Sequence, residues 1–270
     1  MTQLVEGIIY DKFDVIEVNI KNEICETNNA SIKVITEIPL RVVVNGEEYV
    51  SLLSLNQYQE ELALGFLYSE GVINSIGDVK SLYYNVESST VEVDLLETIE
   101  TGYKGSLRSI TSGGGKCFTH IDSENKDKYN KIPIEHLHSG VSIIKRMKSF
   151  LDESKIFVEI GGVHSVLLDN DKYQLLTEDI GRHNALDKIT GILLKNDKMD
   201  LIAESVLYLS GRISSEMITK VIRLGVPVIV SRSTPTATAI KLAEEYNVTL
   251  LGYVRGNKGS IYTVPQRMEL

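Results

Sequence analysis

The most restrictive feature of this sequence is the alternation of short apolar runs with helical patterns beyond residue 156. Short apolar runs predict buried strands, and apolar residues recurring at helical spacing predict helices. This order builds a sheet with parallel neighbours and helices on its faces, which is an α/β fold. The predicted strands are 157–160, 164–168, 173–176, 206–209, 226–230 and 249–254, and the predicted helices are 183–195, 214–224 and 235–246.

The first hundred residues predict a different, α+β portion. Asn45-Gly46 is typical of a hairpin turn because both residues tolerate positive φ. Gly71 is placed to end a helix in the left-handed conformation. The predicted strands of this portion are 32–44, 49–53, 79–86 and 90–95, and its predicted helix is 57–68.

We therefore expect three parts in the chain. Residues 1–111 form the α+β N-terminal portion, residues 112–132 form a glycine-rich loop with Cys117 followed by a polar linker, and residues 133–270 form the α/β/α domain. Pro133 suits the first turn of a helix that runs to about residue 151.

Charge and composition exclude several classes of protein. The chain has 28 basic and 37 acidic residues, a net charge of −9, which argues against binding along a nucleic-acid backbone. No run approaches the roughly 20 apolar residues of a membrane helix, and no secretory signal is recognised, so we expect a cytoplasmic protein. Cys25 and Cys117 lack the spacing of a structural zinc site or a disulfide framework.

Cys117 is the candidate catalytic residue. It follows three consecutive glycines and Lys116, so its thiol is expected to be exposed beside a positive charge, which favours the thiolate. The alternative is that Cys117 is a small apolar filler, as lone cysteines usually are. The glycine run lacks the spacing of a P-loop, and no dinucleotide-binding glycine fingerprint follows a strand, so we exclude both nucleotide folds.

A second group of candidate residues lies where predicted strands end. Residues 178–184 pack acidic, basic, amide and imidazole groups together, which indicates either a ligand site or an exposed capping turn. Two later joints combine small hydroxyl residues with arginine, which suits phosphate oxygens at a helix N-terminus. Glu216 either caps a helix or orients a ligand, and His164 is more often a structural residue in such a place. The candidates are Gly181, Arg182, His183, Asn184, Ser210, Gly211, Arg212, Ser231 and Thr236.

These segments together resemble the formate dehydrogenase accessory sulfurtransferase family (FdhD). The resemblance spans nearly the whole chain, and its longest segment is the most specific one. The segments are EIPL at 37–40, VNG at 44–46, ELALGFL at 61–67, SEG at 69–71, GGVHS at 161–165, EDIGRHNALDK at 178–188, SGRISSEM at 210–217, PT at 235–236 and LLGYVR at 250–255.

The resemblance implies a cytidine-deaminase-like α/β/α sandwich behind a smaller N-terminal portion, and a homodimer. It implies transfer of sulfur from a cysteine desulfurase to the molybdenum-bis(molybdopterin guanine dinucleotide) cofactor of formate dehydrogenase, with a GDP-like guanine nucleotide as a mimic of that substrate. Arg255 and Lys258 suit its pyrophosphate groups. The segment that the resemblance assigns to cofactor binding is Tyr253, Val254, Arg255, Gly256, Asn257 and Lys258.

One position departs from the pattern of that family. The first cysteine of the family's Cys-Gly-x-Cys loop aligns with Gly114, so only Cys117 remains. Either Cys117 alone carries a persulfide, or the chain carries the cofactor without transferring sulfur. A zinc-dependent deaminase, which shares the implied fold, is excluded because the required His-x-Glu and Pro-Cys-x-x-Cys ligands are missing.

Overall fold

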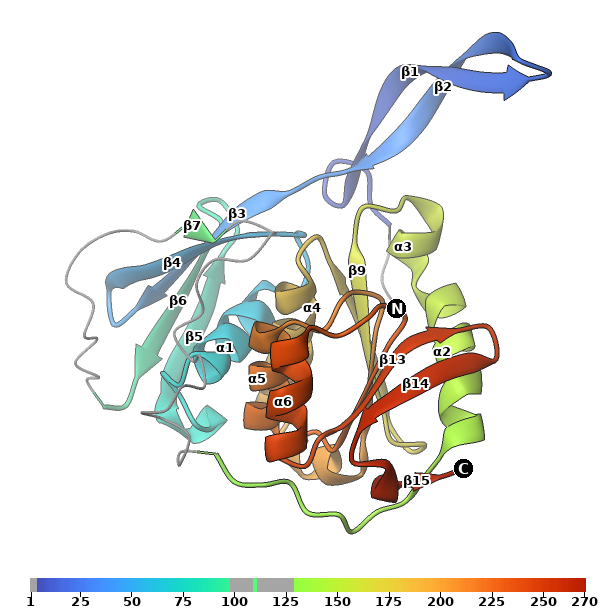
Figure 1. Cartoon of the computed structure of the whole chain (residues 1–270). Coiled ribbons are helices and arrows are strands. Elements are labelled where there is room, and N and C mark those ends of the chain that lie inside the picture. The colour runs from blue at the N-terminus through green and yellow to red at the C-terminus, as the bar shows by residue number, and fades with distance from the viewer. Residues whose placement is uncertain (1–3, 98–108, 111–128) are drawn as a thin grey trace.

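The structure, a computed structural model, describes residues 4–97, 109–110 and 129–270 (Figure 1). It consists of a three-layer C-terminal domain, a smaller N-terminal sheet with one helix, and a β-ribbon that projects from the body. The predicted α/β class with an α+β N-terminal portion is confirmed. None of the helices within the described residues is long and apolar enough to cross a membrane.

The C-terminal domain contains a six-stranded sheet in the order β10-β9-β11-β12-β13-β14. Strands β11, β12 and β13 run parallel, as the alternation predicted, and β9, β10 and β14 run antiparallel to their neighbours. The strands are β9 (His164–Asp169), β10 (Gln174–Asp179), β11 (Val206–Leu209), β12 (Val228–Ser231), β13 (Thr249–Arg255) and β14 (Lys258–Thr263).

Helices cover both faces of this sheet. Successive side chains along each strand point to opposite faces, so the sheet contributes to two hydrophobic cores, one on each face. On one face, apolar side chains of α4, α5 and α6 pack against residues such as Leu207 and Ile229. On the other face, α2 packs against residues such as Tyr208 and Val230. The helices are α2 (Gly140–Glu153), α3 (Lys155–Glu159), α4 (Arg182–Lys195), α5 (Ser215–Leu224) and α6 (Ala237–Glu245), with 3-10 helices η3 (Met199–Glu204) and η4 (Pro265–Arg267) and a short parallel pair, β8 (His138–Ser139) and β15 (Met268–Glu269).

The N-terminal portion is a five-stranded sheet in the order β5-β6-β3-β4-β7, with α1 packed on it. Asn45 and Gly46 both have positive φ, 50° and 81°, which confirms the predicted hairpin turn. Gly71, with φ of 79°, follows the end of α1 as predicted. The elements are β3 (Ile38–Val44), β4 (Glu47–Ser54), α1 (Gln59–Ser69), η1 (Ile76–Asp78), β5 (Val79–Asn85), β6 (Thr90–Leu95) and β7 (Ser109–Ile110).

Helix α1 joins the two portions by crossing α4 at very short range, and two glycines permit this approach. A Cβ added to Gly191 would lie 1.8 Å from the carbonyl oxygen of Glu61, and a Cβ added to Gly65 would lie 1.8 Å from that of Asp187. Any larger residue at either position would therefore push the helices apart.

Two predicted elements are wrong. Residues 157–160 form no strand, because α3 occupies Lys155–Glu159 and its first N–H groups, of Ile156 and Phe157, donate to the Glu178 carboxylate at 3.1 and 2.9 Å. Pro133 does not begin a helix. The buried Arg267 guanidinium donates to the carbonyl of Pro133 and holds this segment outside the helix, which begins only at Gly140 after its N-cap, Ser139.

The long predicted strand 32–44 is two strands. Its first part belongs to a two-stranded ribbon, β1 (Tyr10–Lys21) and β2 (Ile24–Ile35), which projects away from the body in Figure 1. Apolar side chains along the ribbon are widely exposed, for example Ile16 at 67% and Ile20 at 78%. The ribbon therefore presents apolar surface that the rest of the described chain leaves uncovered.

Candidate functional site

The candidate site lies along one edge of the six-stranded sheet. Strands β10, β11, β12 and β13 all end at this edge, and the antiparallel β9 begins there with His164. The N-termini of α4, α5 and α6 follow directly after the strand ends, so their N–H groups face the same edge. In sheets of this kind, ligands bind outside the carboxyl ends of the strands.

An arginine follows each of the four strands that end here. Arg182 begins α4 after β10, Arg212 follows β11, Arg232 follows β12, and Arg255 ends β13. Neighbouring strands lie about 4.8 Å apart, so the four arginines are spread over roughly 19 Å. Within the described residues none of them lies within ion-pair distance of a carboxylate. We call Arg182, Arg212, Arg232 and Arg255 the arginine row.

The arginine row is the clearest chemical property of this edge. In a chain of net charge −9, four guanidinium groups at one edge that have no ion-pair partner within the described residues favour a large anionic ligand. Arg232 is the arginine of the second joint predicted from sequence, although only Ser231 and Thr236 of that joint were selected as candidate site residues.

Arg182 and His183 turn toward the edge at the start of α4. The Nε of Arg182 and the Nε2 of His183 are buried and have no hydrogen-bond partner within the described chain. The His183 Nε2 lies 3.3 Å from a carboxylate oxygen of Glu216, and Ser214, not Glu216, caps α5 by accepting from the N–H of Met217. Burial, together with the positive charges of Lys220 and Arg182, lowers the pKa of His183 to about 3. At neutral pH the contact with Glu216 is therefore not an ion pair.

Asp179 and Asn184 point inward and join the two portions of the chain. The Asp179 carboxylate, fully buried, forms an ion pair with Lys188 at 2.6 Å and accepts from the N–H groups of Leu55 at 3.1 Å and Gly181 at 3.0 Å. The Asn184 side-chain amide donates to Asp179 and to the carbonyl of Leu53, both at 2.9 Å. Four donors from different parts of the chain therefore converge on one carboxylate.

The remaining acids of the segment 178–188 are structural as well. Glu178 accepts from the first N–H groups of α3, and burial raises the pKa of its carboxyl. Asp187 forms a buried ion pair with Lys220 at 2.5 Å and accepts from the hydroxyl of Ser69 at 2.7 Å. The alternative of an exposed capping turn is wrong for these acids, because they hold buried elements together.

The small hydroxyl residues at the joints hold their own loops. Ser231 donates to the carbonyl of Gly211 at 2.6 Å and accepts from the N–H of Ser233, and Ser210 accepts from the N–H of Ser165. Thr236 caps α6 by accepting from the N–H of Ala239. Contact between these hydroxyls and a ligand stays a prediction, and the Ser231 hydroxyl already makes two hydrogen bonds.

Gly211 leaves room for His164 at the centre of the edge. A Cβ at Gly211 would lie 2.9 Å from the Nδ1 of His164 and 3.7 Å from the Cδ of Arg182. Burial and the charge of Arg182 lower the pKa of His164, so a neutral imidazole lies among the arginines. The structure thus adds His164 to the candidate site.

The segment 253–258 forms the end of β13, a turn, and the start of β14. Tyr253, with φ of 57°, donates its N–H to the carbonyl of Ser233, and the Arg255 guanidinium lies 4.5 Å from the centre of the Tyr253 ring. Arg255 also donates to the carbonyl of Arg232 at 3.2 Å. Val254 is buried in the core, so a ligand would meet only its backbone. The exposed Gly256, Asn257 and Lys258 complete the turn.

Cys117 and its glycine run lie outside the described residues. Among the residues that the structure does describe, no three His, Cys, Asp or Glu side chains are grouped to hold a metal ion. The described part of the candidate site therefore offers arginine side chains and helix N-termini, and no grouped metal ligands.

Comparison with known proteins gives a consistent result. The model of the FdhD/NarQ family matches residues 35–269. The chain belongs to the FdhD/NarQ family. It is 37% identical over 249 residues to the sulfur carrier protein FdhD of Bacillus pumilus, covering 90% of this chain and 92% of that protein. It is 36% identical over 248 residues to the protein of the same name from Bacillus subtilis, covering 90% and 93%.

The fold has a counterpart among solved structures. A crystal structure of a protein from Desulfotalea psychrophila, named as a candidate formate dehydrogenase accessory protein, superposes with a TM-score of 0.74. The match covers 97% of this chain and 100% of the other, at 21% sequence identity. This likeness supports the architecture of the FdhD/NarQ chain described above.

We predict that Asp179→Asn strongly destabilises the protein. The change keeps the size of the side chain but leaves Lys188 buried without a counter-charge, and breaking a buried pair in this way costs about 3–5 kcal/mol. Urea denaturation followed by circular dichroism measures the loss. Glu48→Gln, which breaks the exposed pair with Arg41, is the control and should cost about 0–1 kcal/mol. Equally small losses of unfolding free energy in Asp179→Asn and Glu48→Gln would contradict a central structural role for Asp179.

We also predict a pH-dependent contribution of His183 to stability. Its pKa in the folded protein, about 3, lies below the ordinary 6.5, so between these values the unfolded chain binds more protons. The preferential protonation of His183 in the unfolded chain lowers the free energy of unfolding as pH falls below about 6.5. The His183→Gln variant has no imidazole and lacks this effect. The stability of the wild type relative to His183→Gln should therefore fall as the pH is lowered, measured by urea denaturation at several pH values. A difference in the free energy of unfolding between wild type and His183→Gln that does not change with pH would show that His183 has the same pKa in the folded and unfolded states.

Proposed function

We propose that this chain is a sulfurtransferase of the cytoplasm that carries sulfur from a cysteine desulfurase to the molybdenum-bis(molybdopterin guanine dinucleotide) cofactor. In this role it supports the activity of a formate dehydrogenase. The observation that carries the proposal is the arginine row at the strand ends of an FdhD/NarQ chain. The relatives named sulfur carrier protein FdhD support the sulfur chemistry.

The molybdenum cofactor is the substrate of this proposal, and its two pyrophosphate groups are the anions that the arginine row would bind. Guanidinium groups suit phosphate oxygens because they offer paired N–H donors in one plane. The helix N-termini at the same edge offer further N–H groups to an anion. A guanine nucleotide such as GDP contains one pyrophosphate and should bind at part of the same edge.

Cys117 is the proposed sulfur carrier. Its thiolate attacks the outer sulfur of the desulfurase persulfide, a new S–S bond forms, and the desulfurase cysteine leaves as a thiolate. One persulfide is consumed and one is formed, so this exchange needs no external oxidant or reductant. Lys116, the preceding residue, would favour the thiolate form of Cys117.

The second candidate function is that of a cofactor carrier without sulfur transfer. One observation favours it: Gly114 stands where the resemblance places the first cysteine of the family's loop. A carrier needs the arginine row but does not need the thiol. The two functions therefore differ in what they require of Cys117.

The deciding experiment is activation of formate dehydrogenase in a strain that lacks this protein, with protein levels checked. Under sulfur transfer, Cys117→Ala abolishes activation, and Cys25→Ala, which removes the exposed cysteine of β2, leaves it intact. Full activation by Cys117→Ala would establish the carrier function instead.

GDP binding tests the arginine row separately. Arg212→Ala should weaken GDP binding about tenfold, the loss expected for one charge-assisted hydrogen bond, whereas Arg41→Ala in the N-terminal sheet should not change it. Isothermal titration calorimetry measures both. Unchanged GDP binding in Arg212→Ala would show that the arginine row is not the binding site for the guanine nucleotide.

We further propose that the chain forms a homodimer through the projecting ribbon. Its strand register places Ile16, Val18 and Ile20 on one face, opposite the uncharged Asn29, Thr27 and Cys25. An isolated two-stranded ribbon is marginally stable in water, so a partner that covers this face would stabilise it. An uncharged patch can pack against the same patch of a second copy without electrostatic repulsion. Because the ribbon projects from the body, this contact also keeps the bodies of the two chains, each of net charge −9, apart (Figure 1).

Two variants at neighbouring positions test the dimer. Val18→Glu places a charge on the apolar face and should convert the dimer to a monomer, whereas Asn19→Glu places it on the opposite face and should leave the dimer intact. Sedimentation velocity at several concentrations measures the state. A monomeric wild type, or a dimer that survives Val18→Glu, would exclude the ribbon as the interface.

A further inference from the structure

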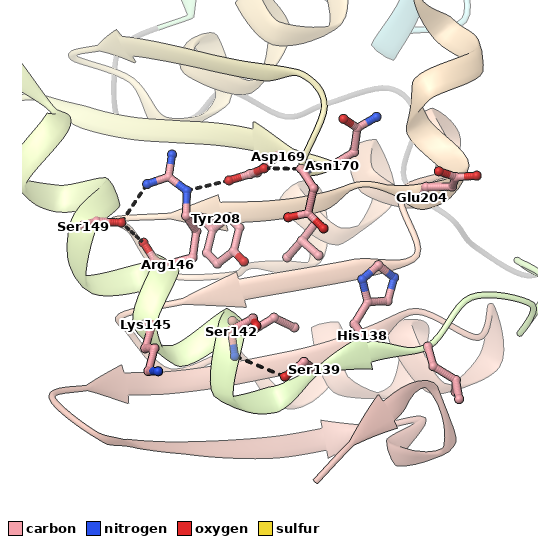
Figure 2. A pocket seen from close by; sticks show the side chains of 14 residues that line it. His138, Ser139, Ser142, Lys145, Arg146, Ser149, Asp169, Asn170, Glu204 and Tyr208 are labelled. Atoms are coloured by element: carbon pink, nitrogen blue, oxygen red, sulfur yellow. Dashed lines mark hydrogen bonds and ion pairs between the residues drawn. The ribbon is translucent and has the colours of Figure 1, made fainter.

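A polar cavity lies at the opposite edge of the same sheet from the arginine row. Its volume is about 570 Å³, which is within the range of small-molecule sites, and it lies between the first turns of α2 and the β9–β10 turn (Figure 2). At this edge β9 ends and β11 begins, so the cavity shares no strand end with the arginine row. Its floor includes Val206 and Tyr208 of β11 and Ile143 of α2.

Tyr208, a nearly buried side chain, brings its hydroxyl to the cavity. The residue is 3% exposed, and its hydroxyl has no hydrogen-bond partner among the described residues. Burial and the nearby carboxylate of Asp169 raise the pKa of Tyr208, so the phenol is neutral. A polar group that opens into a cavity and has no protein partner is expected to bind a water or a ligand there.

His138 brings a second such group from another element. It belongs to β8, which is fixed by its pairing with β15, and its imidazole faces the cavity in Figure 2. Its Nε2 is buried and has no hydrogen-bond partner among the described residues. Burial and the positive charge of Arg267 lower the pKa of His138, so the ring is neutral at physiological pH.

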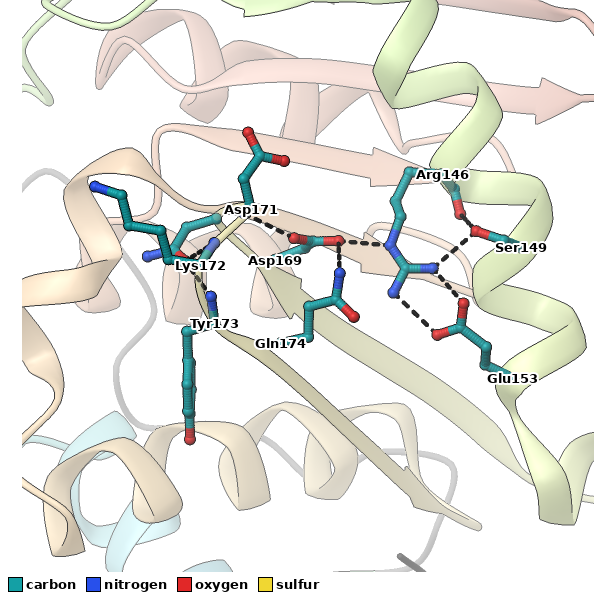
Figure 3. Close-up of polar contacts among 9 residues, drawn as sticks. Arg146, Ser149, Glu153, Asp169, Asp171, Lys172, Tyr173 and Gln174 are labelled. Atoms are coloured by element: carbon teal, nitrogen blue, oxygen red, sulfur yellow. Dashed lines mark hydrogen bonds and ion pairs between the residues drawn. The ribbon is translucent and has the colours of Figure 1, made fainter.

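Arg146, the most conspicuous cation of the cavity wall, is not available to a ligand. Its Nε donates to Asp169 at 2.5 Å, and its two terminal nitrogens donate to Glu153 at 2.7 and 3.0 Å (Figure 3). Asp169 also accepts from the Gln174 side chain at 3.2 Å and from the N–H of Asp171 at 3.0 Å. This network fixes the wall and neutralises its charges.

The charged groups that remain unpaired in the wall are mainly acidic. The carboxylates of Asp171 and Glu204 line the cavity, and neither lies within ion-pair distance of a described cation. Figure 2 shows Glu204 and His138 on one side and Lys145 on another. The neutral phenol of Tyr208 and the neutral imidazole of His138 add oxygen and nitrogen atoms that can accept hydrogen bonds.

We propose that this cavity binds a small organic cation that carries a primary ammonium group. The ammonium supplies three N–H donors and a positive charge, which match the two free carboxylates and the uncharged acceptors of Tyr208 and His138. Lys145 disfavours a second cationic group at its own side of the cavity. The site is separate from the arginine row, whose ligand is anionic.

Three four-carbon probes of different charge test this proposal by calorimetry on the full chain. 4-Amino-1-butanol, which carries a single ammonium group, should bind saturably at one site, and the uncharged 1,4-butanediol and the dianionic succinate should not. Glu204→Gln and Asp171→Asn should each weaken 4-amino-1-butanol binding about fivefold or more, and Tyr208→Phe about twofold or more. Asp200→Asn, which changes an exposed acid of η3 outside the cavity, is the matched control and should leave binding unchanged.

Three results of these measurements would overturn the proposal. 4-Amino-1-butanol that fails to saturate would show that water alone satisfies Tyr208 and His138. Equal binding of 1,4-butanediol would show that charge is not recognised. A loss in Asp200→Asn as large as that in Glu204→Gln would show that only the general acidity of the chain is measured.

Discussion

The structure depends on one buried carboxylate, that of Asp179. It receives the Lys188 ammonium, the Asn184 amide and the N–H groups of Leu55 and Gly181, which come from α4, from the turn before it and from the end of the N-terminal sheet. A fully buried charge is tolerated only when it is paired and its lone pairs are satisfied. The same contacts therefore stabilise the charge, join the two portions of the chain and fix the turn from which Arg182 and His183 reach the edge of the sheet.

The segment 178–188 divides its polar residues between structure and site. Its acids face inward, where each accepts hydrogen bonds from a different neighbouring element. Arg182 and His183 face the edge, where buried nitrogens of both lack partners within the described chain. The acids supply the rigidity that an anion site needs, because a guanidinium can recognise phosphate geometry only when its own backbone is fixed.

The two edges of the six-stranded sheet have opposite chemistry. At the strand ends, an arginine row and three helix N-termini favour an anion. At the opposite edge, Arg146 is neutralised by Asp169 and Glu153, and the carboxylates of Asp171 and Glu204 have no ion-pair partner in the described part of the chain. The anion preference of the first edge follows from the direction of the strands, which brings their carboxyl ends and the following helix N-termini together. The acidic character of the opposite edge depends on which side chains form ion pairs between α2 and β9.

The sequence alone determined the α/β class, the parallel strands β11 to β13, the three helices behind them and the turn at Asn45-Gly46, because each rests on local periodicity or on local φ preference. It also indicated most of the arginine row, since Arg182, Arg212 and Arg255 were among the predicted site residues. Only the tertiary structure decided that residues 155–159 form a helix, that Pro133 lies outside any helix, that Asn184 points inward, and that Gly65 and Gly191 lie at a helix crossing. These features depend on partners distant in sequence, namely Glu178, Arg267, Asp179 and the facing helix, and no local pattern contains that information.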